Sequence, residues 1–204
     1  MRIALLLTQD LSSPSGIGRY YPISRELVEL GHEVNLLALH ADYDNCRERQ
    51  LNLDGVYVNY IGQMHVKKVG NVKKYFKPLS LIWLSIVAIF RTLSNVIKIH
   101  PDIVYVGKPH PMNGIPGAIY SVFNKRTVLI VDCDDHETSS NYFAHRWQKT
   151  TVSFFEKWVI RRAQYLSTNT ISTRNRIVQL GQPEEVVFYL PNGTDPRRFY
   201  EPKK

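Results

Sequence analysis

Residues 2–39 read RIALLLTQDLSSPSGIGRYYPISRELVELGHEVNLLAL, and this stretch decides the fold. The apolar run Ile3–Thr8 is typical of a buried strand, and a loop that contains glycines follows it. A helical pattern comes next, with Leu27 and Leu30 on its apolar face, and Gly31 ends it. Glu33–Leu39 is then a second strand. Two strands joined by a helix predict a parallel pair.

The same alternation continues to the end of the chain. Further strands are expected at Val56–Ile61, Ile103–Val106, Thr127–Val131, Tyr165–Thr168 and Val186–Leu190, and helices at Leu79–Ile99, Asn113–Asn124, Trp147–Ala163 and Ser172–Leu180. Apolar strands separated by helices indicate a parallel sheet covered on both faces. The sequence therefore predicts an α/β fold with a doubly wound, mainly parallel sheet and helices on both faces.

Length and composition favour one large domain. The chain has 204 residues, of which 44% are hydrophobic and 22% charged, as in ordinary soluble globular proteins. We expect a domain at residues 1–190 and the start of a linker at 191–204. Cys46 and Cys133 match no zinc or redox spacing, and the first apolar run is too short for an export signal. A cytoplasmic protein is expected.

Positive charge is concentrated in one segment. The formal net charge is +8, and residues 55–101 contain no Asp or Glu. The segment includes five closely spaced lysines, Lys67, Lys68, Lys73, Lys74 and Lys77, directly before the apolar segment Leu79–Ile99. This pattern suggests an anionic surface as partner, such as the inner face of a membrane. For Leu79–Ile99 itself a core helix on the sheet is expected, and contact of this segment with a membrane surface is the alternative. Nucleic acid is not expected, because no recognition module accompanies the lysines.

A glycine loop lies between the first strand and the first helix, as Ser15-Gly16-Ile17-Gly18-Arg19. At this place in an open α/β sheet, glycines let backbone N–H groups approach an anion, which the helix N-terminus also favours. The alternative is a tight turn that needs glycine for steric reasons. The loop lacks the complete dinucleotide-binding pattern and the lysine of phosphate-binding loops.

An acidic segment follows the predicted strand Thr127–Val131. It reads Asp132-Cys133-Asp134-Asp135-His136-Glu137, and ligands bind outside the carboxyl ends of such strands. Metal ligation, acid–base chemistry and hydrogen bonding to a hydroxyl-rich substrate are all compatible with it, and the alternative is a solvated loop. His110 lies on the same rim, although it could equally be an exposed residue of a proline-stiffened loop.

Four motifs resemble one family of enzymes. Met1–Leu6 with Gly16-Ile17-Gly18-Arg19 looks like its opening strand and glycine loop, and Glu29–Val34 like its helix-to-strand turn. Pro101–Tyr105 resembles the strand before its central loop, and Pro191-Asn192-Gly193-Thr194-Asp195 with Arg198-Phe199 its hinge. The chain is thus similar, over nearly its whole length, to the N-terminal domain of GT-B glycosyltransferases of family 4, a Rossmann-like domain.

The resemblance implies specific roles. Gly16, Gly18 and Arg19 would face the diphosphate of a nucleotide-sugar donor, and Asp135 and His136 would be catalytic. The acceptor side would comprise His110, Asp132, Asp134 and Glu137, and the hinge Asn192 and Asp195. Transfer would need neither metal nor cofactor beyond the nucleotide-diphosphate sugar, with a sugar or lipid-linked acceptor in surface polysaccharide or glycolipid synthesis. The C-terminal donor domain is absent from these residues, or a split partner chain supplies it, so the chain alone is expected to be inactive.

Two alternatives remain open. Asp132 and Asp134 could hold a divalent cation in a metal-dependent GT-A transferase, because carboxylates one residue apart can bind a metal against a diphosphate. The chain could otherwise be a docking module without catalysis, for a membrane or for a partner chain.

Overall fold

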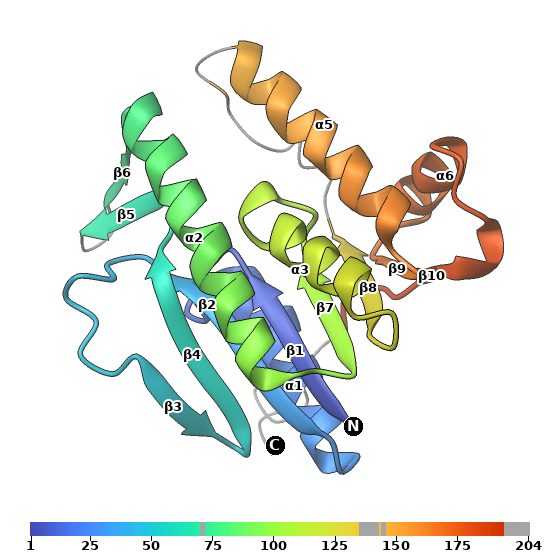
Figure 1. The fold of residues 1–204 in the computed structure, drawn as a ribbon, viewed down its shortest axis with the longest axis horizontal. Helices are drawn as coiled ribbons and strands as arrows, with labels where there is room; N and C mark the ends of the chain where they lie inside the picture. Colours follow the sequence, from blue (N-terminus) through green and yellow to red (C-terminus); the bar gives the residue numbers. More distant parts are fainter. Residues whose placement is uncertain (70–71, 135–142, 144–145, 194–204) are drawn as a thin grey trace, which may run out of the picture.

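The computed structural model describes residues 1–69, 72–134, 143 and 146–193 (Figure 1). Its main sheet has the order β10-β9-β8-β7-β1-β2-β4-β3. The strands are β1 Arg2–Leu7, β2 Glu33–His40, β3 Gln50–Leu53, β4 Val56–Gln63, β7 Ile103–Gly107, β8 Val128–Cys133, β9 Tyr165–Thr168 and β10 Val187–Tyr189. Every pairing is parallel except that of β3 with β4.

The central strand explains why the sheet forms. In β1, Ala4, Leu5, Leu6 and Leu7 are all buried, because helices cover this part of the sheet on both faces. A continuous apolar run suits such a strand, whereas a half-exposed strand would alternate. Leu5 lies opposite one residue of β2 and one of β7, so β1 holds the two halves of the sheet together.

Helices cover the two faces unequally (Figure 1). The π-helical turn η1 (Gly16–Tyr20) and α1 (Tyr21–Glu29) pack on one face, where Tyr20 joins the core. The other face carries α2 (Pro78–Ile99), α3 (Pro111–Phe123), α5 (Arg146–Arg162) and α6 (Ile171–Gln179). A short 3-10 turn η2 (Glu184–Val186) precedes β10. The predicted doubly wound α/β fold is confirmed.

The sheet reverses its order of growth at β1. Strand β2 lies on one side of β1 and β7 on the other. The connection after β1 runs towards β2, whereas the connection after β7 runs the other way, towards β8. The connections therefore leave the carboxyl ends of the neighbouring strands β1 and β7 in opposite directions. Such a switch point leaves a crevice at the carboxyl edge, where open α/β sheets bind ligands. The glycine loop and the loop that begins at Lys108 lie at this place.

Several details differ from the sequence-based expectation. Strand β3 was not predicted, and the lysine-rich segment 63–77, for which no strand was predicted, contains a hairpin of β5 (Val66–Val69) and β6 (Val72–Tyr75). Leu30 caps α1 and is 72% exposed, so it does not belong to the apolar face. Strand β8 continues to Cys133, which places Asp132 inside the sheet.

Helix α2 also departs from the expected core helix. Among its residues only Ala88, Thr92 and Val96 are buried, and none of the three lies before the middle of the helix. In the described part of the chain, α2 is the one helix that is long and apolar enough to cross a membrane by length and composition. Most of its apolar surface is therefore left outside the core.

Candidate functional site

A buried ion pair joins the glycine loop to the end of β8. The Nε and Nη2 groups of Arg19 donate to the two carboxylate oxygens of Asp132, each at 2.8 Å. Arg19 is 7% exposed and Asp132 is fully buried. Burial alone would lower the pKa of Arg19, but the hydrogen bonds and charge of Asp132 raise it above its ordinary value. Arg19 is therefore charged at any physiological pH.

The remaining partners of this pair come from the last strands. Arg19 Nη1 donates to Asn192 Oδ1 at 2.7 Å and to the Leu190 carbonyl at 3.3 Å. Ser167 Oγ donates to Asp132 Oδ1 at 2.6 Å, and the Tyr105 hydroxyl lies 3.2 Å from Ser167 Oγ. One bidentate pair thus connects the glycine loop with the ends of β8, β9 and β10.

The positions of Arg19 and Asp132 differ from those expected. Arg19 was predicted to face a donor diphosphate, but Nε, Nη1 and Nη2 all bind protein acceptors in the interior. Asp132 was predicted on the acceptor side, but its carboxylate is enclosed. Both residues hold the rim together. Asn192, predicted as a hinge residue, belongs to the same network.

Asp134 ends the described part of the acidic segment and has partners of its own. Its Oδ1 accepts a hydrogen bond from Asn169 Nδ2, and Lys108 Nζ lies 3.5 Å from its Oδ2. Lys108 has a φ of 75°, a left-handed conformation that is uncommon for a lysine. Its N–H donates to the Asp132 carbonyl, which holds this strained residue at the mouth of the crevice.

The two glycines of the loop have different surroundings. A Cβ atom at Gly16 would lie 2.5 Å from the Asp10 carbonyl oxygen and 2.8 Å from Leu11 backbone atoms, so only glycine fits there. A Cβ atom at Gly18 would meet nothing within 4 Å, and Gly18 is not among the glycines with positive φ. The fold itself therefore explains Gly16 but not Gly18, which borders open space on the rim.

His110 caps helix α3 at the same edge. Its Nδ1 accepts a hydrogen bond from the Met112 N–H at 3.4 Å, and its ring stacks on His65 at 6.0 Å. Desolvation, with a smaller contribution from His65, lowers the pKa of His110 to about 3. His110 is therefore neutral near pH 7 and acts as a hydrogen-bonding group rather than a cation.

Two buried polar residues at this edge were missed from the sequence. Asn113 donates to the Leu6 and Gly107 carbonyls, both at 2.9 Å, and so holds α3 on β1 and β7. The Asp10 carboxylate lies 3.3 Å from His40 Nε2; burial raises its pKa, but hydrogen bonds from the Ser12 and Ala41 N–H groups outweigh that effect and lower it. The place of Asp10 just after a strand was the one available signal.

The described acids of this edge are thus bound by other groups of the chain. Arg19 binds Asp132, and Lys108 and Asn169 bind Asp134. Within the described residues no three His, Cys, Asp or Glu side chains gather as a metal site. The geometry therefore gives no support to the alternative of a divalent cation on Asp132 and Asp134. The predicted residues Asp135, His136, Glu137 and Asp195 lie outside the described residues.

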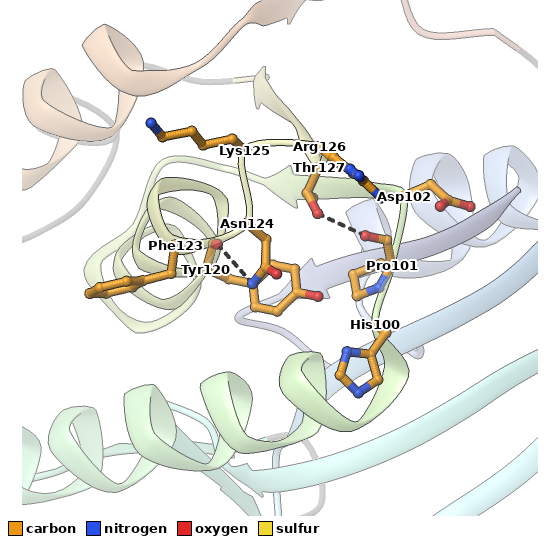
Figure 2. Close-up of a pocket in the computed structure, with 9 residues that line it drawn as sticks. All are labelled: His100, Pro101, Asp102, Tyr120, Phe123, Asn124, Lys125, Arg126 and Thr127. Carbon is orange, nitrogen blue, oxygen red and sulfur yellow. Dashed lines mark hydrogen bonds between the residues drawn. The ribbon is translucent and has the colours of Figure 1, made fainter.

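One hollow in the described surface lies away from this site. It measures about 540 Å³ and is lined by residues 100–102 and 120, 123–127, which precede β7 and β8 (Figure 2). In it Thr127 Oγ1 donates to the Pro101 carbonyl at 3.0 Å. The hollow is thus at the amino edge of the sheet, opposite the glycine loop. Its lining carries none of the predicted site residues.

Comparison with known proteins gives the family. The model of a family described as a glycosyl transferase 4-like domain matches residues 15–193. No protein of curated function matches the sequence.

Solved structures share the fold at low sequence identity. Sucrose-phosphate synthase from Thermosynechococcus elongatus is similar with a TM-score of 0.66 and 12% identity, over 98% of this chain and 50% of that chain. UDP-GlcNAc 2-epimerase from Methanocaldococcus jannaschii has a TM-score of 0.61 and 14% identity, over 94% and 46%. The epimerase from Neisseria meningitidis bound to UDP-GlcNAc has a TM-score of 0.59 and 13% identity, over 93% of this chain and 45% of that chain. The chain spans about half the length of these proteins.

The two loop glycines should respond differently to substitution. Gly16→Ala should destabilise the chain by about 1–3 kcal/mol, because the new methyl group meets fixed backbone atoms. Gly18→Ala should leave the free energy of unfolding unchanged or raise it by up to about 1 kcal/mol, since alanine favours the helix and meets no neighbour. Urea unfolding measures both. Equal destabilisation by the two substitutions would contradict the conclusion that the fold requires glycine at position 16 but not at position 18.

His110 should make the chain sensitive to acid. Its pKa is lower in the folded than in the unfolded state, so the unfolded chain binds the extra proton and stability falls as the pH drops from about 6.5 towards 3. His110→Asn keeps a capping acceptor but cannot titrate. Between pH 6.5 and 4.5 the variant should lose less stability, by about 1 kcal/mol per pH unit. If the free energy of unfolding depended on pH with the same slope in wild type and in His110→Asn, this would refute the role of His110 in acid sensitivity.

Proposed function

Because this chain belongs to the glycosyl transferase 4-like domain family, we propose that it forms the acceptor-binding half of a sugar-transferring enzyme. The donor would be a nucleotide-diphosphate sugar, and most of its binding site would lie on a second domain or on a partner chain. Two observations support this division. The chain spans about half of its structural neighbours, and one neighbour is bound to UDP-GlcNAc, a nucleotide sugar.

The observation that carries the proposal is the open space above Gly18. A helix interior favours alanine over glycine, so a glycine with no steric need inside the chain indicates close approach by something outside it. Gly18 lies in η1, which runs on into α1, so the approaching group would meet the N-terminal end of a helical segment. An anion is favoured there, and the donor diphosphate is such a group.

We assign the acceptor to the rim formed by the loops after β7, β8 and β9. Neutral His110 and Asn169 supply hydrogen-bonding groups of the kind that a hydroxyl-rich molecule requires. The charges of Asp132 and Asp134 are compensated inside the chain, so they would not repel the donor diphosphate. Residues 135–137 continue this segment, and Asp135 and His136 remain the predicted catalytic pair.

The reaction follows from these groups without a metal. An acceptor hydroxyl forms a bond to the anomeric carbon, the bond from that carbon to the diphosphate breaks, and the hydroxyl proton passes to the predicted base. Backbone N–H groups beside Gly18 and basic side chains of the donor half stabilise the departing diphosphate. The chain alone would therefore show no turnover. We place the reaction in the cytoplasm, in the synthesis of a surface polysaccharide or glycolipid.

A transfer assay tests this function. Extracts of cells that lack the gene would be supplied with the wild-type chain, Gly18→Val or Lys125→Ala, together with the donor half, and given labelled nucleotide sugars. Wild type and the amino-edge control Lys125→Ala should incorporate label equally. Gly18→Val, whose Cβ atom would meet no neighbour within 4 Å, should lose at least tenfold, because its side chain would occupy the space of the diphosphate.

Three outcomes would overturn the proposal. Gly18→Val could be fully active, which would remove the diphosphate from the rim. The purified chain could transfer sugar without a donor half. Chelation of divalent cations with EDTA could abolish transfer, which would favour the metal-dependent alternative.

A further inference from the structure

We propose that one surface of this chain docks on an anionic lipid bilayer. The surface, called the lipid face below, combines an apolar stripe on α2 with the exposed lysines that precede it. It consists of Leu79, Trp83, Ile86 and Phe90 on α2, with Lys74 of β6 and Lys77 directly before α2. Docking is a property of the chain itself, and it does not require that the chain transfer sugar.

The apolar stripe is exposed and lies on one side of α2. Leu79, Trp83 and Phe90 are 82%, 65% and 67% exposed, and Ile86 is 41% exposed. Their spacing of four, three and four residues places them along one face of a helix. Contiguous apolar surface of this kind on a protein marks an interaction site.

The second half of α2 is fixed to the sheet, whereas the first half contacts the core only near its end, through Leu84 and Ala88. Val96 is fully buried, Arg91 Nη1 donates to the Ile61 carbonyl at 3.2 Å, and Asn59 Nδ2 donates to Asn95 Oδ1 at 3.2 Å. The first half projects past the sheet beside β5 and β6 (Figure 1). A spanning helix needs about 20 free apolar residues, so the projecting half can lie on a bilayer but cannot cross it.

The pairing of β5 with β6 does not compensate the positive charge of the hairpin. Lys67 lies opposite Lys74, although like charges at facing positions are unfavourable. Lys67 is compensated by Asp42 at 3.0 Å and Asp44 at 3.8 Å, which removes it from the predicted membrane patch. Among the described residues no ion pair compensates Lys68 or Lys74. An external anion would relieve this repulsion.

Lysine next to tryptophan and long apolar side chains matches the layers of a bilayer surface. The ammonium groups suit anionic headgroups, Trp83 suits the interface, and Leu79 and Phe90 suit the acyl boundary. Residues 55–101 contain no acid, so nothing in this segment repels an anionic surface. Because β5 follows the carboxyl end of β4 almost directly, the lipid face lies at the same edge of the sheet as Gly18. A lipid-linked acceptor would then reach the rim from the membrane; this last step rests on the proposed function.

Binding to vesicles tests whether anionic lipid and the lysines of the lipid face are both needed for docking. The chain should co-sediment with vesicles of phosphatidylglycerol and phosphatidylcholine but not with phosphatidylcholine alone, and salt should weaken binding. Lys74→Glu with Lys77→Glu should reduce binding at least tenfold. Lys125→Glu with Arg126→Glu makes the same change in net charge at exposed positions of the amino edge, and it should alter binding less than twofold.

The apolar stripe has its own test. Leu79→Ser with Trp83→Ser should weaken binding to anionic vesicles at least tenfold, whereas Phe123→Ser, at a residue of α3 that is 83% exposed, should not. Brominated lipids should quench the tryptophan fluorescence of wild type more than that of Trp83→Phe. The inference fails if both vesicle types bind equally and without salt dependence, if the lipid-face and control variants bind alike, or if Trp83 is not quenched. Because no sugar transfer is measured, a failure here leaves the proposed function standing.

Discussion

The buried pair of Arg19 and Asp132 is the constraint on which the carboxyl edge of the molecule depends. A guanidinium and a carboxylate can be taken out of water only if each finds the other in good geometry and the remaining donors are satisfied. Two 2.8 Å hydrogen bonds, Ser167, Asn192 and the Leu190 carbonyl meet this requirement. The glycine loop therefore cannot move away from the last strands without leaving a buried charge.

This constraint supports the proposal that an acid-rich edge binds a negatively charged ligand. The described carboxylates are compensated from within, by Arg19 for Asp132 and by Lys108 for Asp134. What the edge presents outward is Gly18 with open space above it, and groups such as His110 that are neutral near pH 7. A rim of this kind is compatible with the proposed nucleotide sugar and hydroxyl-bearing acceptor.

The alternation of apolar strands and helices was enough to predict the fold, because buried parallel strands show their character locally. The site was predicted only as a region. Arg19 and Asp132 are 113 residues apart, and no local pattern shows that they pair. The β5–β6 hairpin was not predicted because lysines seldom favour strands. The left-handed backbone at Lys108 was not predicted because glycine is the residue that usually indicates this conformation. The two glycines looked equivalent until their neighbours were known.

A double-mutant cycle on Arg19 and Asp132 tests the central claim most directly. Arg19→Met and Asp132→Asn would each be measured by urea unfolding, alone and together. The account predicts that Arg19→Met costs about 3–5 kcal/mol because it leaves a buried carboxylate unpaired. It also predicts that the double variant is more stable than the sum of the two losses by at least about 1.5 kcal/mol. Additive losses would show that the pair does not hold the rim together, and would contradict the account.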